Sequence, residues 1–239
     1  AYGRINYSKG FRPICRVRPT TQWRIFMIRR LSILFAAPII LVLCLLMEQA
    51  FAADAAMSAE ETDPINAGQM MPEGNLYNPD GSAVSVSDLY SEKPVVLVYY
   101  RGDWCRYCNQ HLRNLKNFED ELVDLGYQLI AVSADKPEIL SRTKQEAELP
   151  YRLVSDSSMD MANKLGIAFK VSDETIEKYK GYKIDLEEAS GHDHHLLPIP
   201  AVFLIGTDGK ILWTYSDPNY TERLNSEELV AKAKEYSSK

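Results

Sequence analysis

The sequence predicts an α/β domain with a central mixed β-sheet flanked by helices, and three observations favour this fold class. Continuous apolar, β-branched runs of the kind buried in central strands occur at residues 94–100 and 201–205. Between them, strand-like runs alternate with segments whose apolar residues recur at helical spacing. The chain then ends with a hairpin pattern and a helix. Alternation of this kind is typical of a sheet covered on both faces.

The first half of the domain contains two predicted strands. A turn-rich segment at 72–83 precedes a short helical turn at 84–90. The buried strand at 94–100 follows. Apolar residues at three- and four-residue spacing then predict a single helix over 105–126, and residues 127–132 form the next strand.

The second half continues the alternation and closes with a hairpin. Asp208-Gly209, between two apolar runs, is typical of a tight hairpin turn. The predicted elements are helices at 137–148, 159–165 and 175–186 (the last in an inserted segment) and at 225–236, with strands at 151–154, 201–205 and 210–215.

The sequence predicts that this domain spans residues 64–237 and is preceded by a secretory signal peptide at 27–52. Two arginines follow Met27, an apolar run extends over 31–47, and small residues surround an expected cleavage point after Ala52. The alternative is an uncleaved membrane anchor, although the run is slightly shorter than the roughly 20 residues that span a bilayer.

Two further segments flank the signal peptide. Residues 1–26 are basic and contain no acidic residue. We interpret them as a non-native or upstream extension rather than as a nucleic-acid-binding arm, because a signal peptide works at the N-terminus. Residues 53–63 are small and acidic, and are expected to form a flexible leader.

The charge of the exported part argues against nucleic acid as a partner. Residues 1–52 hold eight of the 27 Lys and Arg and one of the 33 Asp and Glu, which leaves 19 basic and 32 acidic residues, a net charge of −13. A chain this acidic is a poor ligand for nucleic acid or an anionic membrane. We expect a periplasmic or secreted protein with no membrane contact after cleavage.

Cysteine usage points to redox chemistry. Cys15 and Cys44 lie in the part expected to be removed, so that Cys105 and Cys108 are the two cysteines retained. A disulfide between them closes too short a loop to stabilise a large domain. A lone CxxC in an exported protein is therefore more consistent with catalysis than with structure. The alternative, a four-cysteine zinc site, lacks a second cysteine pair.

The position of the two cysteines in the predicted helix indicates a role for each thiol. Cys105 falls at the predicted helix N-terminus, where backbone N–H groups and the helix dipole favour a thiolate, and Cys108 lies about one turn later. Arg101 and Arg106 add positive charge that favours the thiolate, while Asp103 opposes them. We therefore expect Cys105 to be the nucleophile and Cys108 the resolving thiol.

Three segments resemble one family. Residues 99–109 are similar to the FYRGGWCPYCN motif of the peroxiredoxin-like branch of the alkyl hydroperoxide reductase/thiol-specific antioxidant (redoxin) family, residues 197–205 to its LPVPATFVID motif, and residues 217–223 to its DPDYTRR motif. The resemblance implies a thioredoxin-like fold. It also implies that Pro200 is a cis-proline facing the CxxC, where Ile199 and Pro200 contact substrate. Independently of the resemblance, Trp104, next to Cys105, is expected to line the active-site mouth and contact substrate.

Departures from the family pattern change the expected activity. Arg106 replaces the usual proline, and the peroxiredoxin signature PxxxTxxC is absent, since Gly102 stands at the threonine position and Val98 at the proline position. We therefore expect a thiol–disulfide oxidoreductase that uses Cys105 and Cys108. The alternative is a thiol peroxidase in which a Cys105 sulfenic acid is resolved by Cys108.

The histidines support a third, weaker hypothesis. His192, His194 and His195 precede the Pro200 region, and two thiolates with an imidazole suit copper, as in Sco-type chaperones, although those proteins use CxxxC. His111 is expected on the helix surface. No metal or cofactor is assigned. The expected partners are a disulfide-containing protein or small molecule, or a hydroperoxide, together with an upstream thiol donor.

Overall fold

The computed structural model describes residues 55–237, all of which belong to the unit Ala52–Lys239. The predicted upstream extension (1–26) and signal peptide (27–52) lie outside the described residues and remain predictions. Within the described range, no helix combines the length and the apolarity needed to cross a membrane.

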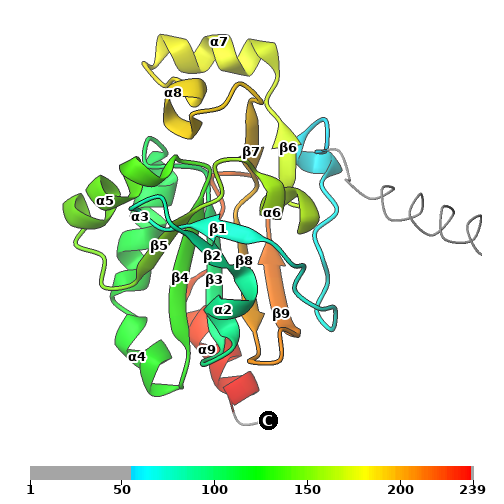
Figure 1. Cartoon of the computed structure of the whole chain (residues 1–239), viewed down its shortest axis with the longest axis vertical. Helices are drawn as coiled ribbons and strands as arrows, with labels where there is room; N and C mark the ends of the chain where they lie inside the picture. The colour runs from blue at the N-terminus through cyan, green and yellow to red at the C-terminus, as the bar shows by residue number, and fades with distance from the viewer. Residues whose placement is uncertain (1–54, 238–239) are drawn as a thin grey trace, which may run out of the picture. The chain divides into compact units, whose positions relative to one another are not determined.

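A seven-stranded mixed sheet forms the centre of the domain, in the order β2-β1-β5-β4-β3-β8-β9 (Figure 1). Strands β3, β4 and β5 are parallel, while β8 runs antiparallel to β3, and β9 to β8. This arrangement confirms the predicted fold class. The strands are β1 (Asn75–Tyr77), β2 (Ala83–Ser85), β3 (Val95–Tyr100), β4 (Gln128–Ser133), β5 (Arg152–Ser155), β8 (Ala201–Ile205) and β9 (Ile211–Ser216).

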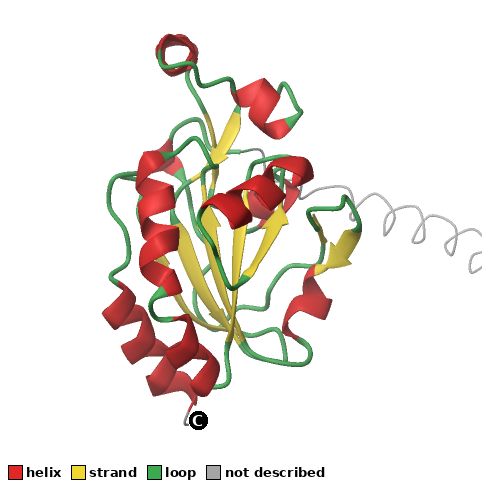
Figure 2. Ribbon diagram, turned by 90° about the vertical axis from the view of Figure 1, so that its left-hand side faces the viewer, coloured by secondary structure: helices red, strands yellow, loops and turns green. Residues whose placement is uncertain are grey.

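Helices cover both faces of the sheet (Figure 2). Side chains of β3 alternate between two apolar clusters, so that Leu97 and Tyr99 pack on one face while Val98 and Tyr100 pack on the other. The first face carries α2 (Val86–Tyr90) and α6 (Asp160–Lys164). The second carries α3 (Arg106–Lys116), α4 (Glu119–Asp124), α5 (Pro137–Glu146) and α9 (Ser226–Ser237).

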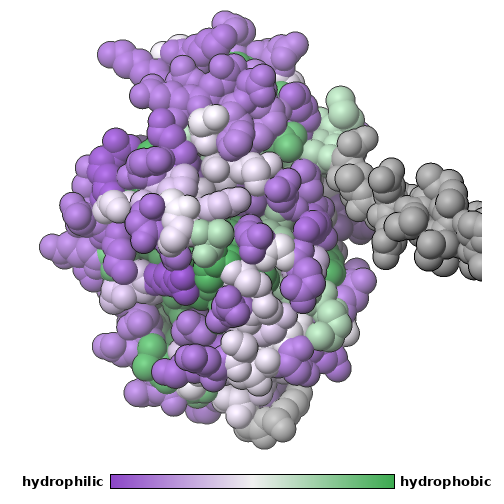
Figure 3. All heavy atoms as spheres, in the orientation of Figure 1, coloured by the Kyte–Doolittle hydropathy of each residue, from purple (hydrophilic) through white to green (hydrophobic). Residues whose placement is uncertain are grey.

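Residues 168–198 form a cap beyond one end of the sheet, at the top of Figure 1. The cap consists of two antiparallel strands and two helices, and polar residues dominate its surface in Figure 3. Its elements are β6 (Ala168–Lys170), α7 (Asp173–Gly181), α8 (Leu186–Ser190) and β7 (Leu196–Pro198).

The segment before residue 64 differs from the expected flexible leader. In its described part, the short 3-10 helix η1 (Ala59–Glu61) follows Ala56, whose backbone N–H donates to Ala168 and whose carbonyl accepts from Lys170. These bonds extend the small sheet of the cap, which explains why residues 55–63 belong to the fold.

The predicted helix over 105–126 is wrong in one respect: it is two helices. Helix α3 ends at Lys116, where the N–H of Asn117 bonds back to the carbonyls of Asn114 and Leu115, and α4 begins at Glu119. Three acidic residues occupy the first turn of α4, where negative charge is favourable. The predicted 175–186 helix likewise ends at Gly181, and a separate helix begins after the Asp185 cap.

Candidate active site

The cysteine pair lies where β3 passes into α3. Cys105 is the N-cap of α3, and the two cysteines form a disulfide with a Cα–Cα distance of 5.2 Å. The backbone N–H of Cys108 also donates to the Cys105 sulfur at 3.4 Å. Cys108 is fully buried and Cys105 is 4% exposed. The spacing of the pair therefore places both sulfurs at the start of one helix, as the sequence predicted.

Arg101, four residues before Cys105, is buried among aromatic rings. Its guanidinium carbon is 4.4 Å from the ring centre of Tyr220 and 5.0 Å from that of Trp104, and the group donates to the hydroxyl of Tyr179 in the cap. Its Nε atom has no hydrogen-bond partner. Ring faces attract a cation. The guanidinium group of Arg101 is therefore held by aromatic rings and one hydroxyl group, and no anionic side chain is among these partners.

A second arginine, Arg223, contacts the other sulfur. Its Nη2 atom lies 3.3 Å from Sγ of Cys108, and its Nη1 atom donates to the carbonyls of Tyr220 and Glu222, both at 2.5 Å. Burial lowers the pKa of Arg223 to about 10, and repulsion by Arg101 contributes. The sequence placed this residue in a family-like segment but gave it no role, because its contact spans 115 positions of the chain.

The loop before Cys105 is anchored to a buried carboxyl group. Oδ2 of Asp135 accepts from the backbone N–H of Asp103 at 2.9 Å and from the Ser133 hydroxyl at 3.1 Å, while Oδ1 has no partner. Burial, assisted by the nearby Asp103, raises the pKa of Asp135 to about 7. This carboxyl group therefore fixes the segment that leads to Cys105.

The backbone conformation and the close neighbours of Gly102 leave no room for a threonine at this position. Its φ is +154°, and a Cβ atom there would lie 2.5 Å from Nε1 of Trp104 and 2.7 Å from Oδ1 of Asp135. A side chain at 102 collides with both groups and strains the backbone. The peroxiredoxin threonine is therefore incompatible with this loop.

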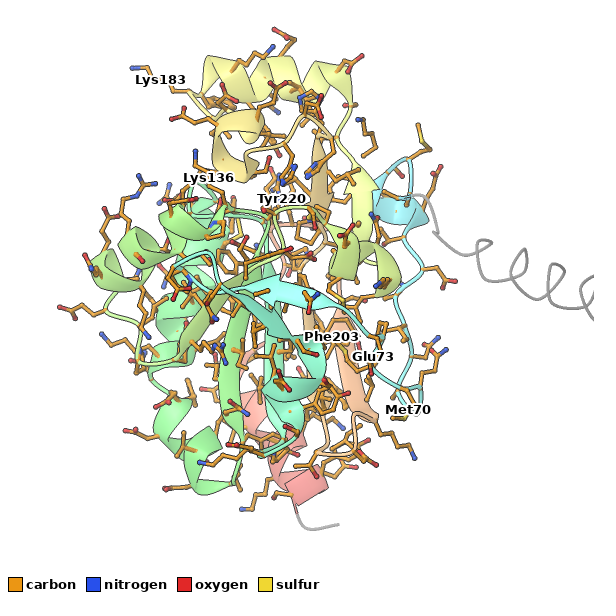
Figure 4. All side chains as sticks on the ribbon, in the orientation of Figure 1. Met70, Glu73, Lys136, Lys183, Phe203 and Tyr220 are labelled. Atoms are coloured by element: carbon orange, nitrogen blue, oxygen red, sulfur yellow. A yellow bond between two sulfur atoms is a disulfide. The ribbon has the colours of Figure 1, made fainter. Side chains whose placement is uncertain are left out.

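The predicted substrate residues occupy two places. Ile199 and Pro200 line a pocket of about 250 Å³ with Arg101, Tyr179 and Tyr220. In Figure 4, Tyr220 lies where the main body of the domain meets the cap. Trp104 packs against the ring of Tyr179 at 5.5 Å instead of lining this pocket.

The cis-proline prediction is wrong. Residues 55–237 contain no cis peptide bond, and Pro200 therefore follows Ile199 in the trans form that X–Pro bonds ordinarily adopt. Hydrogen bonds hold the chain extended here: Ile199 donates to the Ile167 carbonyl at 2.9 Å, and the Pro200 carbonyl accepts from Asp217 at 3.1 Å.

The prediction for His111 is wrong, whereas the role of Arg106 in favouring the thiolate stays a prediction. Arg106 is exposed on the first turn of α3, whereas Arg223 is the arginine in contact with sulfur. His111 is 93% buried instead of lying on the helix surface. Burial lowers the pKa of His111 to about 4, and the charge of Arg223 adds to this effect. At neutral pH this imidazole is uncharged.

The histidines of the cap are bonded to protein groups. The ring of His194 uses both nitrogens, Nε2 with the Ser157 carbonyl at 2.7 Å and Nδ1 with the Leu196 N–H at 2.9 Å. His195 pairs with Glu187 at 2.8 Å. In the described part of the chain, no three His, Cys, Asp or Glu side chains are grouped to hold a metal ion. The geometry gives the copper hypothesis no support.

Comparison with known proteins gives a consistent result. The AhpC/TSA family model matches residues 67–214. Peroxiredoxin Bcp of Escherichia coli K12 is 26% identical over 155 residues, which cover 65% of this chain and 88% of that protein. Chloroplastic peroxiredoxin Q of Suaeda salsa is 28% identical over 103 residues, 43% of this chain and 48% of that protein.

Solved structures share the fold. Peroxidoxin BcpB from Mycobacterium tuberculosis superposes with a TM-score of 0.56 at 18% identity, covering 72% of this chain and 98% of that one. Reduced Prx3 from Vibrio vulnificus in complex with H₂O₂ gives a TM-score of 0.57 at 20% identity, covering 71% and 99%. The predicted thioredoxin-like fold is thereby confirmed.

Proposed function

Because this chain belongs to the AhpC/TSA family, we propose that it is a thiol peroxidase that reduces a hydroperoxide with Cys105 and resolves the product with Cys108. The Cys105 thiolate attacks the O–O bond, an S–O bond forms, and the alcohol or water leaves as it takes up a proton. The Cys108 thiolate then attacks the sulfur of the Cys105 sulfenic acid and forms the disulfide. The hydroxyl group of the sulfenic acid takes up a proton and leaves as water. A thiol donor reduces the disulfide.

One observation carries this proposal. Within the part of the chain matched by the family, the disulfide joins the first and fourth residues of a CxxC motif at a helix N-terminus. This disulfide is the product expected of the second step. The named relatives are peroxiredoxins, which favours the peroxidase over general disulfide exchange.

We further propose that the pocket beside Arg101 admits the hydroperoxide. Arg101 lines this pocket together with Ile199 and Pro200, and its guanidinium group is a donor for a peroxide oxygen. Since Gly102 removes the threonine that orients peroxide in the family signature, a donor from another position is required. Arg101 supplies one.

A thiol–disulfide oxidoreductase remains the second candidate, and Gly102 is the observation that favours it. A CxxC centre without the threonine retains everything needed for disulfide exchange. Both activities use the same two sulfurs, so that only kinetics separates them.

The test compares the two reactions in the reduced full-length chain. As a peroxidase, it consumes one equivalent of peroxide within seconds, and mass mapping finds the new disulfide at Cys105–Cys108. The Cys105→Ser variant loses this reaction, whereas Cys44→Ser retains it. Reduction of insulin by the wild type without reaction with peroxide would instead establish the second candidate.

A further inference from the structure

We propose that Arg223 stabilises the thiolate of Cys108 and so makes Cys108 the leaving thiol when a reductant opens the disulfide. The proposal deepens the redox function proposed above and rests on it. Its starting point is the contact of 3.3 Å between Nη2 of Arg223 and Sγ of Cys108.

Cys108 needs such a partner because it is fully buried. Burial in apolar surroundings disfavours the charged form of a thiol and raises its pKa. A guanidinium N–H donated to the sulfur favours the charged form, and hydrogen bonds to ionised groups are among the strongest in proteins. Arg223 therefore opposes the effect of burial at the one sulfur that it contacts.

The guanidinium group is held in place independently of the sulfur. Its Nη1 atom is bonded to the carbonyls of Tyr220 and Glu222, in the segment between β9 and α9. The pKa of Arg223, about 10, is still well above neutrality, so that the group is charged at pH 7. A fixed charge does not have to reorganise when the disulfide opens.

Groups of both signs act on Arg223. From the end of β3, Arg101 repels Arg223; from α3, His111 is uncharged at neutral pH. The groups that favour the charge of Arg223 are Tyr215 of β9, Asp217 and Glu222. While the disulfide is intact, Sγ of Cys108 carries no negative charge to pair with Arg223. Opening the disulfide places a thiolate there, and this favours the reduced form.

The direction of attack follows from exposure and charge together. Cys105 is the more exposed residue of the pair, at 4% against 0% for Cys108, and the thiol of lower pKa leaves faster. The reductant thiolate attacks Sγ of Cys105 and forms a mixed disulfide. The Cys105–Cys108 bond breaks, and its electron pair remains on Cys108. A second reductant thiolate then attacks the mixed disulfide, releasing the oxidised reductant and the Cys105 thiolate, which takes up a proton.

The first test measures the thiol of Cys108 directly. In a Cys105→Ser background, iodoacetamide labels Cys108 over pH 5–10, and mass mapping isolates the modified peptide. We expect Arg223→Gln to raise the labelling midpoint by a unit or more, which lowers the labelling rate at pH 7 about tenfold. Arg223→Lys restores part of the shift, because a cation is retained. The matched control is Arg113→Gln, an exposed position of α3.

The second test measures the disulfide at equilibrium. Equilibrated with glutathione buffers, Arg223→Gln in the otherwise intact chain should need a ratio of reduced to oxidised glutathione about tenfold higher for half reduction. An unchanged labelling midpoint and an unchanged glutathione ratio in folded Arg223→Gln would overturn the proposal. Thermal melting of each variant establishes that it is folded. Neither measurement uses peroxide, so absence of peroxidase activity leaves both results interpretable.

Discussion

At the scale of single residues, the loop before Cys105 combines a strained glycine with a buried carboxyl group. Gly102 leaves room for Trp104 and for the carboxyl group of Asp135, whose other oxygen accepts from the backbone of Asp103. The missing threonine of the family signature and the unusual environment of Asp135 are thus two consequences of one packing arrangement. Each can be changed separately.

Restoring threonine at position 102 is expected to damage the fold. Gly102→Thr strains the backbone and displaces Asp135 or Trp104, which should lower the free energy of unfolding by about 2–5 kcal/mol. Urea denaturation measures the change. Gly81→Ala is the matched control, since Gly81 also has a positive φ, +81°, but has no atom within 4 Å of the added Cβ. Equal losses in both variants would show that the collision has no effect.

Asp135 is expected to make stability depend on pH. Its pKa is raised from 3.8 to about 7 in the folded state, so between about pH 4 and 7 the folded protein keeps a proton that the unfolded chain has released. Stability therefore falls as pH rises through this window. Urea denaturation at pH 5 and pH 8 should show a smaller loss in Asp135→Asn than in the wild type. The exposed Asp120→Asn should retain the wild-type loss.

Some features of the site could be predicted from the sequence and others could not. The cysteine pair was predictable because its spacing along one helix determines its geometry. The contact of Arg223 with Cys108 was not, since it depends on how a loop 115 positions later folds back. The burial of His111 was not predictable for the same reason. The apolar spacing along α3 does not show whether this position is exposed, and the distant segment near Leu224 covers it.

At the scale of elements, strong apolar runs were predicted and short strands were missed. Strands β3 and β8 are buried throughout, so continuous apolar sequence identified them. Strands β1 and β6 have three residues each, and pairing across the fold stabilises them. Local sequence carries little information on such strands. The acidic start of α4 was a signal for the helix break that apolar spacing alone concealed.

The contact between the cap and β3 is expected to stabilise the domain. Tyr179 of α7 accepts from Arg101 through its hydroxyl, and its ring packs on Trp104. Tyr179→Phe keeps the ring but leaves a buried guanidinium donor without a partner, which should cost about 1–3 kcal/mol. Thermal or urea denaturation measures it. Tyr182→Phe, at an exposed tyrosine beside the same helix, should be neutral, and equal effects would contradict the assignment.

At the scale of the whole molecule, two parts of one domain contribute to the proposed redox centre. The main sheet supplies the strand–helix junction and its disulfide, and the cap supplies the tyrosine that holds Arg101. Residues 53–239 carry a net charge of −13. This charge disfavours binding to anionic surfaces, and it contrasts with the basic segment that precedes it in the chain.

We propose that residues 27–52 direct export of this acidic domain, and this predicts an outcome for a chain that starts at Met27. The argument joins the Arg29-Arg30 pair, the apolar run after it and the small residues before Ala53 with a disulfide, a bond that persists in oxidising compartments. Alkaline phosphatase lacking its own signal is active only after export. Fused after residue 60 in a Gram-negative host, it should be active, and the processed fusion should begin at Ala53.

A matched pair of variants separates a signal peptide from a passive hydrophobic segment. Replacing Leu41 and Leu45 with arginine interrupts the apolar run and should abolish phosphatase activity, since charged residues are costly in a membrane-inserting segment. The control is a fusion made after residue 237 in which Leu76 and Leu89 of the folded domain are replaced with arginine. This change should reduce the yield of the fusion protein without changing the point at which the signal peptide is cleaved. Activity that survives interruption of the run would exclude export through residues 27–52. An active but unprocessed fusion would identify the membrane anchor instead, because export without cleavage leaves the apolar run in the bilayer.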